Sequence, residues 1–304
     1  MNKIGKLVLN RNFILILAVV TGLLVGDVAK LFKGYIIYLL ALVMIFSTTS
    51  ISTRAFLPLR KTIKPFLLGI LLNYFIFGIF LLIASSIFIR EEIIFKGFVV
   101  IAATPPGVAI IPFTFIFKGD TEYGIIGVLG AFFASIFMAP LLIVLFTGSN
   151  AVNPLDIFFL MGKVIVLPFL LSRLLLHEKL KPNIEKIRGS VVDWGFALII
   201  FIVVGLNRDV LYTNPSLLAR VSVVLFTSTF VLGTLYEFIM KFFKRSKNKI
   251  IPEILLVTTK SSGFSAVTAI AVFNERAAIP SALLAIFVLI YLLFLSFRSE
   301  LNYL

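Results

Sequence analysis

Two short stretches interrupt long apolar runs of this chain in the same way, and their residue types could bind ions. The first consists of Thr104, Pro105, Pro106 and Gly107, and the second of Lys260, Ser261, Ser262 and Gly263. Adjacent prolines cannot sit in a helix interior, and a lysine deep in an apolar run is costly and usually functional. Each break would leave free carbonyls, which suit a cation, beside the free amides of a new half-helix, which suit an anion. We therefore expect these residues to form a substrate- or ion-binding site.

The chemistry at the two breaks is expected to differ. The two prolines cannot donate hydrogen bonds to the carbonyls of Ile101 and Ala102. Lys260 lies about nine residues into its run, or roughly 13 Å at 1.5 Å per residue, which is close to a membrane midplane. Its ammonium would bind a substrate carboxylate or stand in for a bound cation. The alternative is a lysine whose stem extends so that its charge lies at the cytoplasmic interface.

The sequences that follow the two breaks also correspond, which indicates an internal repeat. Phe117 and Phe273 occupy the same place after Gly107 and Gly263. We interpret the stretches as the same element of two repeats, each a helix broken at mid-membrane. Inverted repeats with broken helices at corresponding places are typical of secondary transporters. The alternative is that the prolines only kink one helix of a bundle.

The composition places these breaks in a polytopic helical membrane protein. Of the 304 residues, 60% are hydrophobic and 14% are charged, and apolar runs of about 18–23 residues can each cross a bilayer as a helix. We predict ten spans, over residues 12–31, 34–52, 63–89, 95–117, 122–147, 155–176, 189–206, 217–240, 251–273 and 278–297. Five spans per half place the second half, 150–304, upside down relative to the first, 1–149. The predicted fold class is an all-α polytopic membrane protein of two inverted five-helix repeats, with helices 4 and 9 broken and crossing.

The net charge of +14 is explained by lysine and arginine residues in loops rather than by binding to nucleic acid. With a cytoplasmic N-terminus, most of these residues fall on the cytoplasmic side. We therefore predict a multi-pass protein of the cell membrane with both termini in the cytoplasm. The basic loop from Lys241 to Lys249 is either a topology anchor alone or an attraction for anionic lipid.

The sequence contains no signature of an enzyme, a cofactor site or a metal site. It has no cysteine, its single histidine, His177, falls in a charged loop, and the common zinc, nucleophile and phosphate motifs are absent. We therefore expect no catalytic residue, no cofactor and no bound metal. Asn73 is a further candidate binding residue, while Lys163 and Glu253 either take part or lie at the interface. Glu253 shares a helix face with Lys260 and could pair with it through an intermediate group.

At these residues the chain resembles the bile acid:sodium symporter family over nearly its whole length. The resemblance is clearest in the segment from the first break to Lys118, Gly119 and Asp120. It recurs at the second break and at Leu72, Asn73 and Tyr74. The family often reads Pro-Gly-Gly-Thr-Ala-Ser-Asn and Lys-Gly-Asp at the first break and Gln-Asn-Ser-Gly at the second, and often has glutamine at Asn73. The resemblance implies a panel and a core domain, each drawn from both repeats, with the broken helices crossing in the core. It also implies sodium-driven transport of organic anions.

The positions that would hold sodium in the family differ in this chain. Ile110 and Ile111 replace ligands of the fourth span, and residues 127–131 of the fifth span lack a hydroxyl. On the ninth span, Leu256 replaces a glutamate and Lys260 a glutamine. Apolar side chains cannot ligate a hard cation, and an ammonium would repel one. We therefore expect a transporter of organic carboxylates that is not coupled to sodium.

We expect the Lys260 ammonium to replace the bound cation, held by the carbonyls of Ile101 and Ala102 or by Asn73 and Thr104. Transport would be uniport, exchange or, because a buried lysine can release its proton, proton-coupled. The alternatives are a sodium-coupled organic anion or bile acid symporter and a ligand-binding channel or sensor. The expected partners are a small organic anion and the lipid bilayer.

Overall fold

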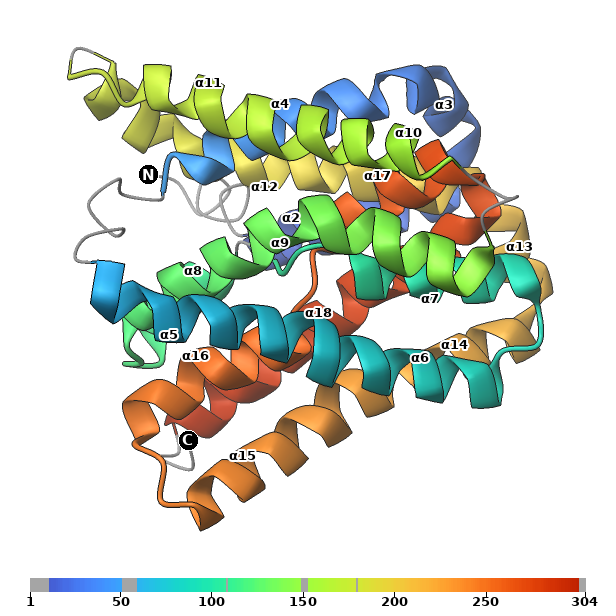
Figure 1. The fold of residues 1–304 in the computed structure, drawn as a ribbon. Helices are drawn as coiled ribbons and strands as arrows, with labels where there is room; N and C mark the ends of the chain where they lie inside the picture. Colours follow the sequence, from blue (N-terminus) through green and yellow to red (C-terminus); the bar gives the residue numbers. More distant parts are fainter. Residues whose placement is uncertain (1–10, 51–58, 108, 149–152, 179, 301–304) are drawn as a thin grey trace.

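The chain is helical throughout the part that the computed structural model describes, residues 11–50, 59–107, 109–148, 153–178 and 180–300 (Figure 1). No β-strand occurs in these ranges. Within these ranges, seven helical stretches are long and apolar enough to span a membrane: Gly26–Thr48, Thr62–Phe88, Thr121–Thr147, Pro154–Leu175, Lys181–Leu206, Pro215–Phe242 and Glu275–Ser299. The protein is therefore an all-helical, multi-pass membrane protein.

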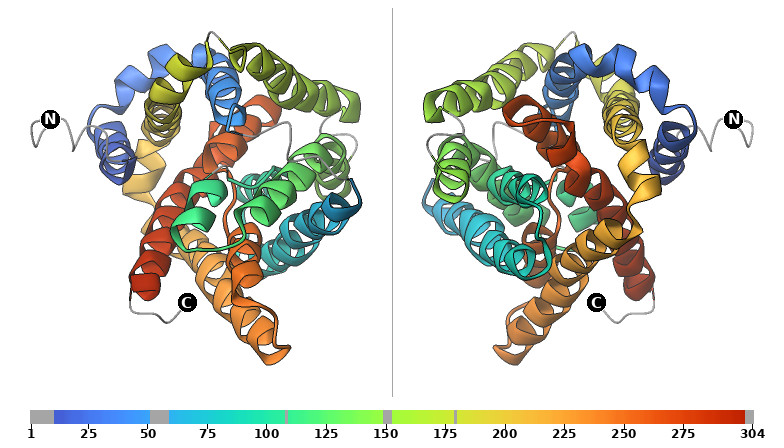
Figure 2. Two further views of the ribbon diagram at one scale, coloured as in Figure 1. Left: turned by 90° about the vertical axis from the view of Figure 1, so that its left-hand side faces the viewer. Right: turned by 90° about the vertical axis from the view of Figure 1, so that its right-hand side faces the viewer.

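The helices form two groups that lie against each other (Figures 1 and 2). The first, the α12 group, contains α2 (Arg11–Leu24), α3 (Gly26–Phe32), η1 (Lys33–Tyr35), α4 (Ile36–Thr48), α10 (Pro154–Met161), η4 (Gly162–Val166), α11 (Leu167–Leu175), α12 (Lys181–Leu206) and α13 (Arg208–Thr213). The second, the crossing group, contains α5 (Leu59–Ile70), η3 (Leu71–Ile76), α6 (Phe77–Phe88), α7 (Glu92–Ala103), α8 (Ile110–Ile116), α9 (Thr121–Thr147), α14 (Pro215–Phe226), η5 (Thr227–Val231), α15 (Leu232–Phe242), α16 (Lys247–Thr258), α17 (Ser262–Val272), η6 (Glu275–Ala278) and α18 (Ile279–Glu300). α12 is the centre of the first group because it packs against α2, α3 and α4.

The end of the predicted first span, 12–31, is wrong. Val25 leaves the helical conformation, with φ −121° and ψ 35°, so α2 ends before it and α3 begins at Gly26. α3 belongs instead to the candidate span that continues through α4. At this bend the backbone runs against α12, where a Cβ on Gly26 would lie only 2.8 Å from the carbonyl oxygen of Gly205. The bend therefore brings two glycines into contact, which a hydropathy pattern does not reveal.

The fourth and ninth predicted spans are interrupted at the two stretches, as expected. α7 ends before Thr104, which is extended with φ −84° and ψ 161°, because a following proline disfavours the helical conformation. α16 ends before Thr259, and no proline follows it. There the Ser261 hydroxyl accepts the N–H of Phe264 and caps the new helix α17. The depth of the breaks in the membrane, the total of ten spans and the inverted repeat stay predictions.

Three of the long helical stretches contain a π turn, namely η3, η4 and η5. η3 and η5 fall in the predicted third and eighth spans, which correspond in the two halves. π turns are frequent at functional sites because the extra residue redirects neighbouring side chains. Asn73 lies within η3 and is fully buried.

α5 and α9 pack so closely that Gly69 has no room for a side chain. A Cβ there would overlap the backbone carbonyl of Gly127, which cannot move cheaply. Gly69→Ala is therefore expected to lower the free energy of unfolding by about 1–3 kcal/mol, the usual cost of overpacking. The measurement is the thermal unfolding midpoint of the protein in detergent.

The matched control is Gly189→Ala in α12, where nothing lies within 4 Å of the added Cβ. That change is expected to stabilise the helix by up to about 1 kcal/mol. Equal effects of the two substitutions on the unfolding midpoint would contradict the close packing of α5 on α9.

Candidate functional site

The two broken helices meet at their breaks, where the extended segments pair antiparallel to each other. Pro106 pairs with Lys260. On either side of this pair, the N–H of Gly107 donates to the Thr259 carbonyl at 3.0 Å, and the N–H of Ser261 donates to the Pro105 carbonyl at 3.3 Å. Each break thus satisfies backbone groups of the other, which a membrane interior requires.

The Lys260 side chain lies inside this crossing and is 2% exposed. Its Nζ donates to the carbonyl oxygen of Thr104 at 2.6 Å and to that of Ala102 at 3.0 Å. The same atom lies 4.7 Å from the ring centroid of Tyr74 and 5.4 Å from that of Phe77. Aromatic faces attract cations at such distances. The ammonium is therefore held by carbonyl dipoles and ring faces.

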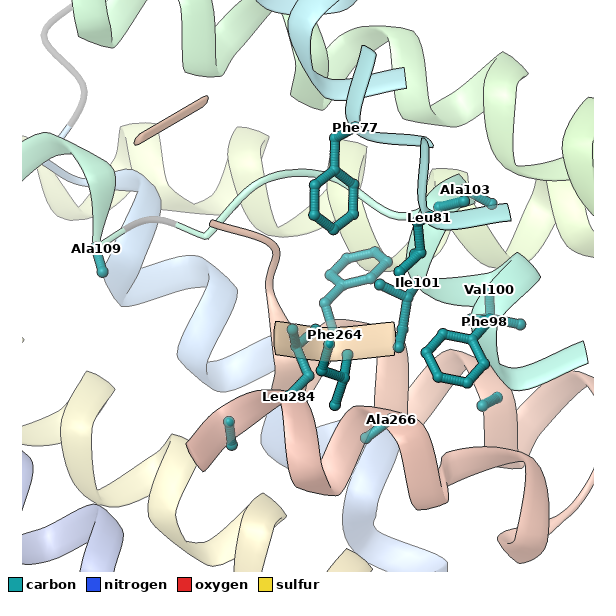
Figure 3. Packing of buried hydrophobic residues seen from close by; sticks show 14 of the residues in the cluster. Phe77, Leu81, Phe98, Val100, Ile101, Ala103, Ala109, Phe264, Ala266 and Leu284 are labelled. Atoms are coloured by element: carbon teal, nitrogen blue, oxygen red, sulfur yellow. The ribbon is translucent and has the colours of Figure 1, made fainter. Parts of the chain in front are cut away.

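No carboxylate of the described residues lies within 4.0 Å of the Lys260 ammonium. Phe77, Ile101 and Phe264 belong to the buried hydrophobic residues of this region (Figure 3). A charge without a counter-ion in such surroundings is costly. In its charged form, Lys260 is a cation that an anion could neutralise.

The carbonyls freed by the two prolines have different partners. The Ala102 carbonyl accepts the ammonium, as expected, but the expectation for Ile101 is wrong. Its carbonyl accepts the Thr104 hydroxyl at 3.1 Å, because threonine commonly bonds to a carbonyl three residues back. Asn73 also takes part, since its Nδ2 points at the Thr104 carbonyl at 3.5 Å. Its Oδ1 and the Thr259 hydroxyl are buried without a partner among the described residues.

The amide end of α17 lies beside a small cavity between the two helix groups. The cavity has a volume of about 50 Å³, and its lining includes Gly107, Lys260, Ser261, Ser262 and Gly263. Phe196 of α12 closes it on the other side, where a Cβ on Gly263 would lie 2.6 Å from the Phe196 ring. The structure therefore brings the residues of both breaks to the boundary between the groups.

A larger cavity, which the sequence did not reveal, continues from this boundary between α4, α8 and α12. Its volume is about 580 Å³, and Ala109, Phe113 and Phe196 line both cavities. Among the described residues of its lining, Arg188 is the one cation and Asp193 the one acid. We call it the Arg188 cavity. It offers an apolar wall and a guanidinium, which suit an amphipathic anion.

The positions expected to have lost sodium ligands are buried and apolar. Ile110 and Leu256 are almost fully buried, and Leu256 packs so closely on α9 that a Cβ on Gly127 would lie 2.7 Å from its Cδ1. No group of three or more His, Cys, Asp or Glu side chains that could hold a metal is found in the described residues. The side chains at Ile110 and Leu256 offer no oxygen ligand to a hard cation.

Glu253 has other partners than Lys260 among the described residues, and a pairing of the two through an intermediate group stays a prediction. Its carboxylate is buried and accepts hydrogen bonds from Arg245 at 2.7 Å, from Tyr123 at 2.8 Å and from Tyr236 at 3.1 Å. These partners come from a loop and from two other helices, so sequence spacing could not show them.

Lys163 lies on η4 with its side chain exposed. Its exposure agrees with a lysine that extends toward an interface rather than with a binding residue.

A comparison with family models places this architecture among known proteins. The model described as Sodium Bile acid symporter family matches residues 37–214, which is more than half of the chain and includes the first break. A comparison with curated proteins gives no match.

Proposed function

Because the chain belongs to the sodium bile acid symporter family, we propose that it is a secondary active transporter of an organic carboxylate that is not coupled to sodium. The observation that carries the proposal is the Lys260 ammonium on the carbonyls of Ala102 and Thr104. Such carbonyls, freed at a broken helix, are the groups that coordinate a coupling cation in transporters of this kind. Here the cation is part of the chain.

The register of the crossing supports two inverted repeats. Pro105 and Ser261 are the second residues of their stretches and are therefore equivalent in the repeat. They face each other in the antiparallel pairing, as a two-fold axis through the crossing requires. The helix packing follows the same relation, since α7 packs on α18 as α16 packs on α9. In this proposal the crossing group is the core domain and the α12 group is the panel domain.

The two helix groups also suggest how access alternates. The Arg188 cavity lies on the side that loop charge predicts to be cytoplasmic. On the opposite side, an ion pair between Lys33 of η1 and Glu275 of η6 joins the groups. A carboxylate that enters from the cytoplasm would meet Arg188 first and the crossing next. Movement of the α12 group against the crossing group would then expose the crossing to the side opposite the cytoplasm.

The test is transport in proteoliposomes with labelled cholate and pyruvate, which represent steroid and keto carboxylates. The initial rate for the substrate that is carried is expected to be the same, within a factor of two, in sodium and in choline medium. Arg188→Gln is expected to lower this rate about tenfold, because a charge-assisted contact contributes about 1.5 kcal/mol or more. An imposed pH gradient distinguishes proton coupling from uniport or exchange.

The matched control is Arg220→Gln on α14, whose guanidinium contacts its own helix at Ser216 and does not line the cavity. A rate that depends on a sodium gradient would overturn the proposal. Single-channel conductance in planar bilayers would favour the rival function, a passive channel. Stabilisation by a carboxylate without any transport would favour a sensor.

A further inference from the structure

A second large cavity lies on the lipid-facing surface of the crossing group and plays no part in the proposed transport. It occupies about 760 Å³, and its lining residues come from α5, η3, α9, α15, α16 and the loop between α15 and α16. The residues that line it are Lys64, Leu67, Leu68, Ile70, Leu71, Phe75, Ile76, Tyr123, Tyr236, Met240, Arg245 and Glu253. We call it the lateral cavity. It opens toward the membrane, since Leu67, Leu71 and Phe75 are each about half exposed.

The lateral cavity is polar at one end and apolar along its length. Along α5 and η3 the lining runs from Lys64 through leucine and isoleucine residues to Ile76. Twelve residues of helix cover about 18 Å at 1.5 Å per residue. One leaflet of a hydrocarbon core of about 30 Å is roughly 15 Å thick. The cavity is therefore long enough for one acyl chain that lies along the helices.

The polar end carries an excess of positive charge. Arg245 directs its Nη2 at Glu253 and at the Tyr123 hydroxyl, so one of the two cations that line this end is neutralised. Lys64 is exposed and has no acidic partner within 4.0 Å among the described residues. Lys249 adds a further charge over the Tyr123 ring, 5.8 Å from its centroid. This end faces the side on which loop charge predicts the cytoplasm.

We propose that the lateral cavity binds one anionic phospholipid of the cytoplasmic leaflet. Its phosphate contacts Lys64 and the remaining N–H groups of Arg245, and one acyl chain lies between α5–η3 and α15. Basic pockets between membrane helices on the cytoplasmic side recognise anionic headgroups in this way. The proposal gives the basic loop that follows α15 a binding role beyond that of a topology anchor. It does not depend on which solute the protein transports.

The test is native mass spectrometry of the full chain in detergent with added dioleoyl phosphatidylglycerol or dioleoyl phosphatidylcholine. We expect one tightly retained phosphatidylglycerol per chain and at least fivefold lower occupancy by phosphatidylcholine. Lys64→Gln is expected to lower phosphatidylglycerol occupancy about fivefold, which corresponds to about 1 kcal/mol per basic residue near the headgroups. Leu67→Trp, which places a bulky side chain in the apolar part, is expected to lower occupancy by both lipids.

The matched control is Lys247→Gln, an exposed lysine near the same surface that does not line the cavity. It should change occupancy less than twofold. Equal losses in Lys64→Gln and Lys247→Gln would show attraction to surface charge only and would overturn the proposal. Equal retention of the two lipids by the unaltered chain would show an apolar groove without headgroup recognition, which also overturns it.

Discussion

Lys260→Ala is expected to impair sodium-independent transport and to create a sodium site at the crossing. The change empties the crossing and removes the ammonium from the carbonyls of Ala102 and Thr104. The Asn73 amide, whose Oδ1 has no partner in the described part of the chain, lies beside them. Three oxygens around a small buried space are suitable ligands for a hard cation. Transport by the variant is expected to fall more than tenfold in choline medium.

The measurement for this variant is its unfolding midpoint in sodium chloride and in choline chloride. A ligand at about 100 times its dissociation constant stabilises a protein by about 2.7 kcal/mol, which raises the midpoint by several degrees. The unaltered chain should show no such difference, because its ammonium already occupies the carbonyls. The ion-dependent difference is a sharper measure than stability alone, since removal of a buried ammonium also removes its desolvation cost.

Two further variants separate charge from volume at this position. Lys260→Met keeps most of the side-chain volume without the charge, so it should lose transport and gain no response to sodium. Lys163→Ala removes the exposed lysine of η4 and should change neither property. The hypothesis that the Lys260 ammonium takes the place of a bound cation would be contradicted by either of two results. One is stabilisation of the unaltered chain by sodium, and the other is full transport by Lys260→Ala.

The first break and part of its chemistry could be predicted from sequence because proline acts locally. Pro106 removes the hydrogen bond to Ala102, and that carbonyl is one of the two that accept the Lys260 ammonium. The second break could be predicted only from its match to the first, since it contains no proline. The prolines alone do not predict the partner of the Ile101 carbonyl, because the Thr104 hydroxyl binds it at short range.

The rest of the site depends on tertiary packing that sequence spacing does not encode. Arg188 becomes a candidate binding residue only because α12 lies beside α8 and α4 around one cavity. In the same way, Gly127 on α9 leaves the space that the Leu256 side chain fills. The two positions belong to different predicted spans, so their complementarity is visible only in the folded protein.

Arg245→Met is expected to be the most destabilising single change among those considered, because it leaves the Glu253 carboxylate buried without its counter-ion. Glu253 has 1% of its side chain exposed and Arg245 has 33%. Breaking a buried pair by removing one partner usually costs 3–5 kcal/mol, and the partial exposure of Arg245 places this pair near the lower end, at about 3 kcal/mol. The measurement is thermal unfolding in detergent.

A double-mutant cycle distinguishes an unpaired charge from lost packing. Glu253→Gln keeps the side-chain size, and its amide can still bond both tyrosine hydroxyls, because its oxygen accepts from one of them and its NH2 donates to the other. It should therefore cost less than Arg245→Met. In the double variant no unpaired carboxylate remains, so most of the loss caused by Arg245→Met should be recovered. Additive losses in the cycle would mean that the two residues act independently. The cluster at the start of α16 would then contribute packing alone, and the ion pair would not anchor the helix that carries Lys260 into the crossing.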